Sequence, residues 1–279
     1  MRFVKMHGLG NDFIVVNGFT ESLPAELSLL AKNICHRQLG VGGDGLLVVG
    51  PTEAAGADAC FDIYNSDGSR AEMCGNGIRC ATIFAQKEGI CKQEMISFAT
   101  LAGLVKAQIV DGQNNLVKVK MGTPYLNPRE IPANFAGEMM VSAPVIVGHH
   151  TYNMTLVSMG NPHSVIFVED VENYPVQEEG PKIEKHDLFP AKTNVEFIQP
   201  VTEKKLRMRV WERGCGETLA CGTGACAAVV AAVLNNICQK DTDIEVVLRH
   251  GSLIINWGRD NQVTMTGPAV YVFSGQYDV

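Results

Sequence analysis

The sequence predicts an α+β protein with two pseudo-symmetric domains, each a curled antiparallel sheet wrapped around a central helix. The first observation behind this prediction is a repeated order of motifs. A Gly-Asn pair at 10–11, an aromatic-polar pair and a Cys-Gly-x-Gly run at 74–77 recur as 160–161, a second aromatic-polar pair and 221–224. Two copies about half a chain apart indicate duplicated domains rather than a solenoid.

Short strand-like segments are the second observation. They alternate polar and apolar residues or are briefly apolar, and turn residues separate them. They lie at 13–18, 44–49, 59–65, 103–110, 115–121, 152–158, 163–169, 194–199, 205–211, 244–249 and 252–257. Helical patterns lie at 25–38, 75–88 and 222–236, and the last of these is apolar on every side, so we expect it to be buried all round.

A stretch rich in proline separates the two halves. Residues 122–144 contain four prolines and show little periodicity, which is typical of a linker. We therefore predict an N-terminal half-repeat over 1–121 and a C-terminal half-repeat over 122–266. The last strand, over residues 267–279, is expected to return to the N-terminal half.

The overall composition excludes several classes of partner. The chain has 279 residues, a net charge of −7 and 46% hydrophobic residues, with a pI near 5.5. Nucleic acids and anionic membranes need a basic face, so neither is expected to bind, and a small molecule is the expected ligand. The N-terminal residues lack the apolar stretch of a signal peptide, and no apolar run reaches the roughly 18 residues of a membrane span, which predicts a cytoplasmic protein.

Nine cysteines, an odd number, cannot all pair within one chain, and in a reducing cytosol we expect free thiols. Cys35, Cys60, Cys91 and Cys238 are expected to be ordinary core or surface residues. Two of the three close spacings leave five residues between the cysteines. This is longer than the roughly two to four residues usual in structural zinc sites, so we expect no bound metal.

Cys74 and Cys221 each open a helical stretch. A thiol at a helix N-terminus faces unpaired backbone N–H groups and the positive end of the helix dipole, which favour the thiolate and can lower its pKa below the free value of about 8.5. Two such thiols suggest an acid and a base rather than a single nucleophile. The same helix N-termini can hold a carboxylate through the amides of Gly75, Asn76, Gly222 and Thr223.

Taken together, the motifs resemble diaminopimelate epimerase from end to end. The resemblance rests on eight segments in order, namely His7–Phe13, Tyr64–Ser69, Met73–Gly77, Met159–His163, Thr193–Val195, Trp211–Gly214, Gly216–Thr218 and Ala220–Gly224. It implies a cofactor-independent epimerase that interconverts LL- and meso-2,6-diaminoheptanedioate for lysine and peptidoglycan precursor synthesis. It also implies two barrel-like domains, each around a central helix, and a homodimer.

The resemblance also assigns roles to residues. Cys74 and Cys221 would be the catalytic pair, with His163 and Glu212 tuning their pKa values. Substrate would be bound by Asn11, Asn65, Gly75, Asn76, Asn161, Asn194, Glu212, Arg213, Gly222 and Thr223. Within this set, Glu212 would lie near the distal ammonium, and the distal carboxylate would be bound by Asn65, Asn161, Asn194 and Arg213. One position departs from the family pattern, because Gly45 stands where many members carry glutamine.

Two other functions stay open. Proline racemase and hydroxyproline epimerase use the same paired thiols, but their first motif typically carries histidine at the position of Asn76. Their monocarboxylate substrates would also give Arg213 no distal partner. A thiol-rich binding module without turnover is the second alternative, and uptake of solvent deuterium at the α-carbon separates turnover from binding.

Overall fold

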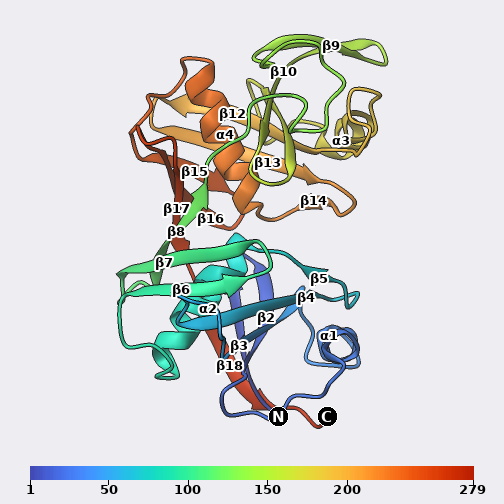
Figure 1. The fold of residues 1–279 in the computed structure, drawn as a ribbon. Helices are drawn as coiled ribbons and strands as arrows, with labels where there is room; N and C mark the ends of the chain where they lie inside the picture. Colours follow the sequence, from blue (N-terminus) through green and yellow to red (C-terminus); the bar gives the residue numbers. More distant parts are fainter. The chain divides into compact units, whose positions relative to one another are not determined.

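The computed structural model describes all 279 residues, which form two compact units (Figure 1). Unit 1 consists of residues 1–120 together with 266–279, and unit 2 consists of residues 121–265. Each unit has its own strands and its own central helix. None of the helices combines the length and the apolar character that crossing a lipid bilayer requires.

Unit 1 builds its sheet mainly from antiparallel neighbours. Its elements are β1 (Arg2–Gly8), β2 (Asn11–Asn17), α1 (Leu27–Cys35), β3 (Gly45–Gly50), β4 (Ala59–Asn65), β5 (Arg70–Ala71), α2 (Gly75–Lys87), β6 (Met95–Thr100), β7 (Gly103–Asp111), β8 (Leu116–Gly122), whose last two residues belong to unit 2, and, at the end of the chain, β18 (Val270–Gln276). The pairs β18–β1, β1–β2, β3–β4, β4–β5, β6–β7 and β7–β8 are antiparallel. Crossovers through α1 and α2 make β2–β3 and β4–β6 parallel.

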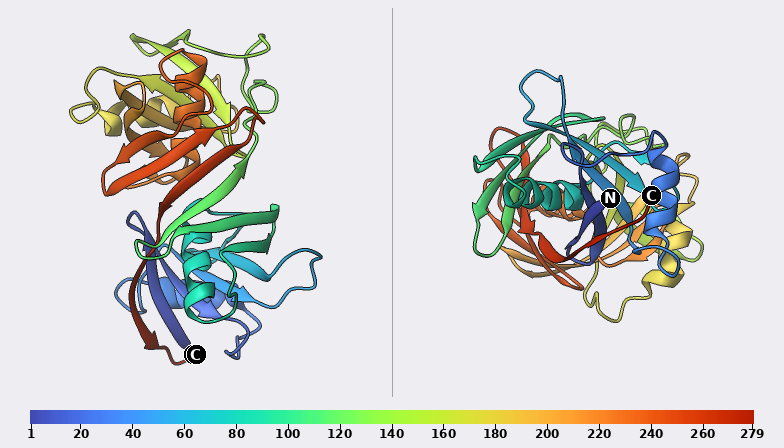
Figure 2. Two further views of the ribbon diagram at one scale, coloured as in Figure 1. Left: turned by 90° about the vertical axis from the view of Figure 1, so that its left-hand side faces the viewer. Right: turned by 90° about the horizontal axis from the view of Figure 1, so that it is seen from below.

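The central helix α2 forms the middle of unit 1. Eleven of its residues, from Gly75 to Ala85, are buried. It packs against β1, β2, β3, β4 and β7, and Figure 2 shows strands of unit 1 on either side of it. Helix α1 is amphipathic instead and buries one face, including Leu30 and Ile34, against β3 and β4. Helix α2 is therefore enclosed by the sheet, whereas α1 lies on its outside.

Unit 2 repeats this order of elements and of strand pairs. Its elements are β9 (Ala143–Val147), β10 (His150–Ser158), β11 (Pro162–Phe167), α3 (Val176–Glu184), β12 (Asn194–Thr202), β13 (Lys205–Glu212), β14 (Gly216–Thr218), α4 (Gly222–Leu234), β15 (Ile244–Leu248), β16 (Gly251–Trp257) and β17 (Val263–Pro268), whose last residues belong to unit 1. The pairs β9–β10, β10–β11, β12–β13, β13–β14 and β15–β16 are antiparallel, and β11–β12 and β13–β15 are parallel. The duplication read from the motifs therefore extends to the sheet.

Helix α4 is buried on every side, as its uniformly apolar sequence predicts. Alanine and valine make up most of it, and all residues from Gly224 to Ala232 are buried. It packs against β10, β11, β12, β13, β15 and β16. The predicted α+β class, with a central helix inside the sheet of each unit, is confirmed.

The structure corrects the sequence predictions in several places. The sheets are mixed rather than wholly antiparallel, because each helical crossover returns the chain in the same direction. Helix α3 was not predicted, since Gly180 and Pro181 interrupt its pattern. Gly180 has a packing role, because a Cβ there would lie 2.5 Å from the ring of Trp211. The strands not predicted from the sequence are β1, β5, β6, β9, β14 and β17.

The proline-rich stretch after β8 is part of unit 2. It contains no helix or strand before β9, but Ile131 and Met140 are buried in the hydrophobic core of that unit. Tyr125 also forms an isolated β-bridge with Ser158. The stretch is therefore packed rather than a free linker.

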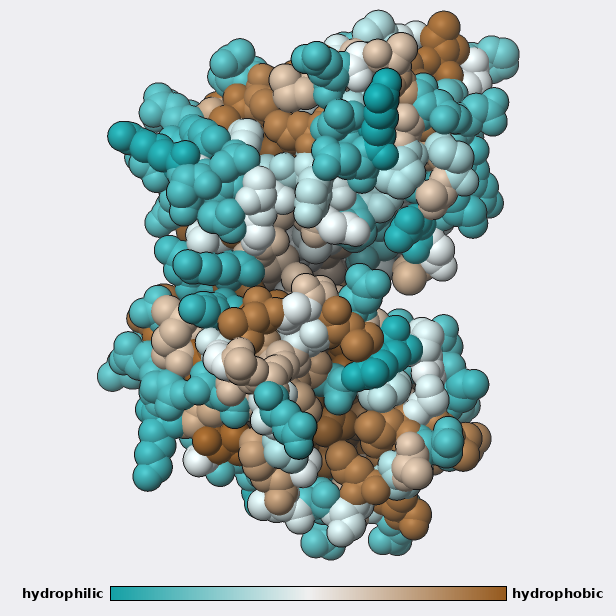
Figure 3. All heavy atoms as spheres, in the orientation of Figure 1, coloured by the Kyte–Doolittle hydropathy of each residue, from teal (hydrophilic) through white to brown (hydrophobic).

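Apolar atoms are not confined to the interior, and Figure 3 shows apolar surface on both units between hydrophilic side chains.

Candidate active site

Cys74 is the N-cap residue of α2, directly before its first turn. Its backbone is extended, with φ −143° and ψ 117°, as is usual for an N-cap. The first-turn amides of Gly75 and Asn76 have no acceptor within the helix, because a helix leaves its first N–H groups unpaired. Gly77 keeps this turn close to the sheet, because a Cβ there would lie 3.1 Å from the ring of Phe61.

Three polar side chains fix the first turn of α2. Asn11, at the start of β2, places Oδ1 3.8 Å from Cys74 Sγ and accepts a hydrogen bond from Asn76 Nδ2 at 3.0 Å. Arg79 is completely buried and donates to Asn76 Oδ1 at 2.9 Å and to the Gly75 carbonyl at 3.2 Å. The guanidinium therefore sets the direction of the Asn76 amide, which in turn donates to Asn11.

An ionic cluster holds Asn11 from its other end. Asn11 Nδ2 donates to Asp44 Oδ2 at 2.8 Å. Arg37 bridges Asp44 and Asp12 at 2.7 and 2.9 Å, and Lys5 Nζ lies 2.6 Å from Asp12. Burial alone would raise the pKa of Asp12, but hydrogen bonds from Arg37 and Lys5 lower it to about 2. Because an ionised carboxylate only accepts, Asp44 turns the amide nitrogen of Asn11 toward itself and the carbonyl toward the thiol.

Asn65 lies at the end of β4, opposite Gly45 of β3. Its side chain is exposed, and Nδ2 donates to Ser69 Oγ at 2.9 Å. The strands approach closely here, since a Cβ on Gly45 would lie 2.8 Å from the carbonyl oxygen of Tyr64. The glutamine that the resemblance implies at this position would therefore require β3 or β4 to shift.

Cys221 occupies the same N-cap position on α4, with φ −122° and ψ 111°. Its hydrogen bonding differs from that of Cys74. The N–H of Gly224 donates to Cys221 Sγ at 3.4 Å, and Thr223 Oγ1 lies 3.5 Å from the same sulfur. The residue is only 5% exposed, so this thiol is buried with potential donors beside it.

A chain of polar side chains leads from Thr223 into the core of unit 2. Asn161 Nδ2 lies 3.3 Å from Thr223 Oγ1, and Asn161 Oδ1 lies 3.0 Å from His163 Nε2. His163 Nδ1 lies 2.7 Å from Glu196 Oε1, and both side chains are 0% exposed. The parallel pair β11–β12 brings the histidine and the glutamate together.

Burial governs the ionisation of Cys221 and Glu212. Glu212, at the end of β13, accepts a hydrogen bond from Thr218, and burial raises its pKa. Burial also raises the pKa of Cys221 well above its ordinary value, and the carboxylates of Glu212 and Glu196 raise it further. The expectation that a helix N-terminus lowers the thiol pKa is therefore wrong for Cys221, because desolvation disfavours the thiolate more than its two hydrogen bonds favour it.

Asn194 and Arg213 lie at the ends of β12 and β13. Asn194 is 4% exposed, donates to the Pro162 carbonyl at 2.8 Å and accepts from the Arg213 backbone N–H at 2.9 Å. Arg213 Nη1 donates to the Ala191 carbonyl at 3.3 Å, and the residue is exposed. Asn194 thus uses both ends of its amide to hold neighbouring backbone, whereas the Arg213 guanidinium remains open to solvent.

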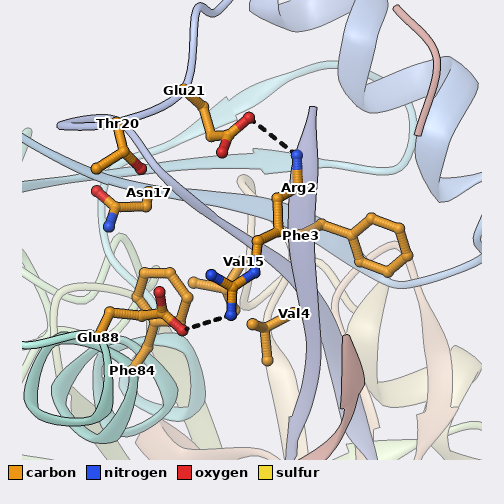
Figure 4. A pocket seen from close by; sticks show the side chains of 9 residues that line it. All are labelled: Arg2, Phe3, Val4, Val15, Asn17, Thr20, Glu21, Phe84 and Glu88. Atoms are coloured by element: carbon orange, nitrogen blue, oxygen red, sulfur yellow. Dashed lines mark hydrogen bonds and ion pairs between the residues drawn. The ribbon is translucent and has the colours of Figure 1, made fainter. Parts of the chain in front are cut away.

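A separate small pocket in unit 1 contains none of the predicted site residues (Figure 4). The backbone N–H of Arg2 donates to Glu21 at 2.9 Å, and its guanidinium lies 3.5 Å from Glu88. The pocket offers neither a thiol nor a histidine. Its lining residues are Arg2, Phe3, Val4, Val15, Asn17, Thr20, Glu21, Phe84 and Glu88.

Comparison with known proteins decides the family. The sequence profile of diaminopimelate epimerase matches residues 3–127 and 155–272. The chain is 49% identical over 280 residues to the diaminopimelate epimerase of Moorella thermoacetica, covering 99% of each chain. It is 51% identical over 280 residues to that of Desulfitobacterium hafniense, covering 99% of this chain and 97% of the relative. The chain belongs to the diaminopimelate epimerase family. The resemblance predicted from the motifs is confirmed.

Solved structures with little sequence similarity share the family's fold. A PhzF-family phenazine biosynthesis protein of Bacillus anthracis matches with a TM-score of 0.72 at 15% identity, covering 100% of this chain and 99% of that one. A probable proline racemase of Agrobacterium radiobacter matches with a TM-score of 0.73 at 15% identity, covering 100% and 93%. At these identities the likeness concerns the fold alone.

Sequence reasoning missed three residues that support the site. Asp44 orients Asn11, Arg79 orients Asn76, and Glu196 pairs with His163. Arg79 leaves a signal, as a charge within a helical run whose neighbours are apolar. Glu196 leaves a weaker one, as a carboxylate within the apolar strand that follows Asn194. Neither signal names the partner, because the partners come from other elements.

Proposed function

We propose that this chain interconverts LL- and meso-diaminopimelate, a step of lysine biosynthesis, with two thiols as acid and base. The observation that carries the proposal is the matched pair of N-cap cysteines, Cys74 on α2 and Cys221 on α4, in a member of the diaminopimelate epimerase family. A positioned acid or base typically contributes about 10²- to 10⁴-fold to a rate, so two of them can drive proton exchange at carbon.

The reaction balances with one proton taken and one given. One thiolate removes the α-proton, and the other thiol delivers its proton to the opposite face, so that the two sulfurs exchange protonation states. The raised pKa of Cys221 keeps this thiol protonated at neutral pH, which suits the proton donor. In the reverse reaction the two sulfurs exchange roles.

The helix N-termini supply the second part of the chemistry. Their first-turn amides have no acceptor within the helix and can bind the α-carboxylate, into which charge spreads as the carbanion forms. Such preorganised donors stabilise charge where it develops and need no rearrangement during the reaction. The amides assigned to this task are those of Gly75, Asn76, Gly222 and Thr223.

The residues proposed for the distal end of the substrate differ in their exposure and in the hydrogen bonds that they already make. The exposed guanidinium of Arg213 suits a planar carboxylate, which it can bind with two parallel hydrogen bonds. Asn65 is also exposed, whereas Asn161 and Asn194 already hydrogen-bond through both ends of their amides. Arg213 is therefore the strongest candidate, with Glu212 for the distal ammonium and Asn11 as a further contact.

Deuterium uptake tests the proposal. The protein is incubated in D₂O with LL-diaminopimelate and no added cofactor, with free proline and hydroxyproline in parallel. We expect deuterium at the α-carbon of diaminopimelate together with the meso product. Exchange with proline alone would favour the racemase alternative. Binding without any exchange would favour the non-catalytic alternative.

We also propose that the protein is a cytoplasmic homodimer with no nucleic-acid or membrane partner. The net charge of −7 supports the second part, since both partners prefer basic surfaces. Exposed apolar side chains on β18 support the first, namely Val270, Val272 and Phe273 at 38%, 51% and 46% exposure. Light scattering on the purified protein tests it, and charged substitutions at Val272 and Phe273 should then give monomers.

A further inference from the structure

A buried carboxylate is linked to the Cys221 thiol by four consecutive polar contacts. They join Glu196 to His163 at 2.7 Å, His163 to Asn161 at 3.0 Å, Asn161 to Thr223 at 3.3 Å and Thr223 to Cys221 at 3.5 Å. The mechanism above uses the thiol but not the carboxylate. Glu196 is therefore a buried titratable group still without a role.

The charge of Glu196 needs compensation within the core. Glu196 and His163 are both 0% exposed, and Glu196 Oε2 makes no hydrogen bond. A buried carboxylate is stable only when it is paired with an opposite charge. The hydrogen-bond pattern supplies that charge, because His163 Nδ1 faces the carboxylate and Nε2 faces the carbonyl oxygen of Asn161. Both ring nitrogens then carry hydrogens, which makes the ring an imidazolium.

The direction of hydrogen bonding follows from this charge state. An imidazolium donates to Asn161 Oδ1, so the amide nitrogen of Asn161 points toward Thr223 and donates to its Oγ1. The Thr223 hydroxyl has then accepted one hydrogen bond, and its own hydrogen is available to Cys221 Sγ. Together with the N–H of Gly224, this gives the sulfur two donors.

The carboxylate of Glu196 alone would disfavour a nearby thiolate, but the imidazolium paired with it offsets this charge. We propose that Glu196, acting through this pair, is a positioning residue that stabilises the thiolate formed when Cys221 gives up its proton. It acts through His163 and Asn161, which turn the Thr223 hydroxyl toward the sulfur. Glu196 lies close to the first turn of α4, because a Cβ on Gly224 would lie only 2.7 Å from Glu196 Oε1. The proposal deepens the proposed function and rests on it in one respect, namely that Cys221 exchanges a proton with the substrate.

Charge balance decides the expected sign of a substitution. In Glu196→Gln a carboxylate–imidazolium pair is replaced by an amide beside a neutral ring, so the net charge near Cys221 stays the same. The glutamine carbonyl takes the place of the carboxylate oxygen and accepts from Nδ1–H, which leaves Nε2 of the neutral ring as an acceptor. The Asn161 amide then turns over, and the Thr223 hydroxyl donates to Asn161 instead of the sulfur. The variant therefore loses one donor to the thiolate.

The other charged groups around α4 leave this balance unchanged. Of its neighbouring strands, β11, β12 and β13 contribute the titratable groups that act here, His163, Glu196 and Glu212. Glu212 is the same in wild type and variant. The remaining titratable side chains of β10, β13 and β15 are His150, Tyr152, Lys205, Arg207, Arg209 and Glu245. Several of these have partners elsewhere, since Tyr152 donates to Glu179, Arg209 donates to Glu217 and Glu245 accepts from Ser252.

Alkylation of Cys221 by iodoacetamide, followed by peptide mass spectrometry in a Cys74→Ala background without substrate, tests the proposal. We expect Glu196→Gln and Thr223→Val each to slow alkylation at pH 8 by about tenfold, the effect of one hydrogen bond to a charged sulfur. Because Glu196 acts through Thr223, the double variant should be no slower than either single variant. Thr223→Ser keeps the hydroxyl and should alkylate at the wild-type rate, and Glu245→Gln on β15 is the matched control.

Two results would overturn the proposal: faster alkylation in Glu196→Gln, or slowing that multiplies in the double variant. If Glu196→Gln does not fold, ¹⁵N NMR of the His163 ring in the otherwise wild-type protein decides the question. Two protonated ring nitrogens at pH 7 are expected, and a neutral ring would refute the relay. Neither measurement uses diaminopimelate, so a failure of the proposed reaction is seen separately in the deuterium experiment.

Discussion

The two half-sites share one backbone design but differ in the polarity of their hydrogen bonds. In each unit a cysteine caps the central helix and an asparagine from a preceding strand pair lies near the helix N-terminus. In unit 1 a carboxylate orients that asparagine, so its carbonyl faces Cys74. In unit 2 an imidazole orients it, so its amide nitrogen faces the threonine beside Cys221.

Because of this difference, two duplicated domains can give their two thiols different protonation preferences. Proton exchange at one carbon needs one thiol protonated and the other ionised at any moment. Identical surroundings would give both thiols the same preference. The carbonyl of Asn11 accepts from a thiol, whereas Thr223 and Gly224 donate to a sulfur, so the two sites are built for different hydrogen-bonding partners.

The largest expected loss of activity comes from removing each thiol in turn. Cys74→Ala and Cys221→Ala should each lower net epimerisation by about 10²- to 10⁴-fold, because each face of the α-carbon needs its own acid or base. Conversion of LL- to meso-diaminopimelate, measured by chiral chromatography, gives the rates. Cys215→Ala is the control, since that thiol is exposed. Retention of more than about a tenth of the activity in either variant would show that one site works alone.

Arg79 tests how unit 1 holds its helix N-terminus. Arg79→Met should lower the free energy of unfolding by about 2–4 kcal/mol, because the buried acceptors at Gly75, Asn76 and Pro268 lose their donor. Cys226 occupies the equivalent position in α4, and Cys226→Ala should cost only about 1 kcal/mol. Urea unfolding measures both changes. Equal losses would mean that the two helices are supported alike.

Arg213 tests a feature that only unit 2 carries. The strand registers place Ser66 of unit 1 at the equivalent position, since Tyr64 pairs with Leu46 as Trp211 pairs with Val195. Arg213→Lys should raise the KM for diaminopimelate about tenfold, because lysine keeps the charge but loses the two-pronged contact. Steady-state kinetics measure the change against Arg207→Lys, an exposed arginine of β13. An unchanged KM would remove Arg213 from the distal site.

Buried structural thiols give the smallest effect. Burial raises the pKa of Cys80 from 9.0 to about 12. The unfolded chain therefore loses this proton first, so the stabilisation is complete below pH 9 and is lost as the pH rises from 9 toward 12. The free energy of unfolding should fall by about 1 kcal/mol at pH 10 through this thiol. Cys80→Ala should flatten the alkaline slope of urea midpoints, whereas Cys215→Ala should leave it unchanged.

The sequence predicted those features that depend on residues close together in the chain. The Cys-Gly-x-Gly runs placed both N-caps correctly, and the uniform apolar pattern of 222–236 identified a helix buried on all sides. The parallel strand pairs were missed because alternation within a strand carries no information on the direction of its neighbour. Helix α3 was missed because its packing on Trp211, rather than its pattern, stabilises it.

The charge state of the site could not be read from the sequence for a similar reason. The helix N-terminus at Cys221 is visible in the motif, but its burial and the carboxylates of Glu196 and Glu212 come from two other strands. Likewise Asp44 reaches Asn11 across 33 residues of chain. Long-range partners decide these properties, whereas a motif records only short spacings.

The discontinuity of unit 1 has a consequence for synthesis on the ribosome. Unit 2 is one continuous segment, 121–265, whereas unit 1 is built from two segments at opposite ends of the chain. Unit 1 must wait, because β1 pairs with β18, with Arg2 opposite Gln276. Arg79 also donates to the carbonyl of Pro268. The half-site of Cys74 is therefore translated first but acquires its full support only after β18 has been made.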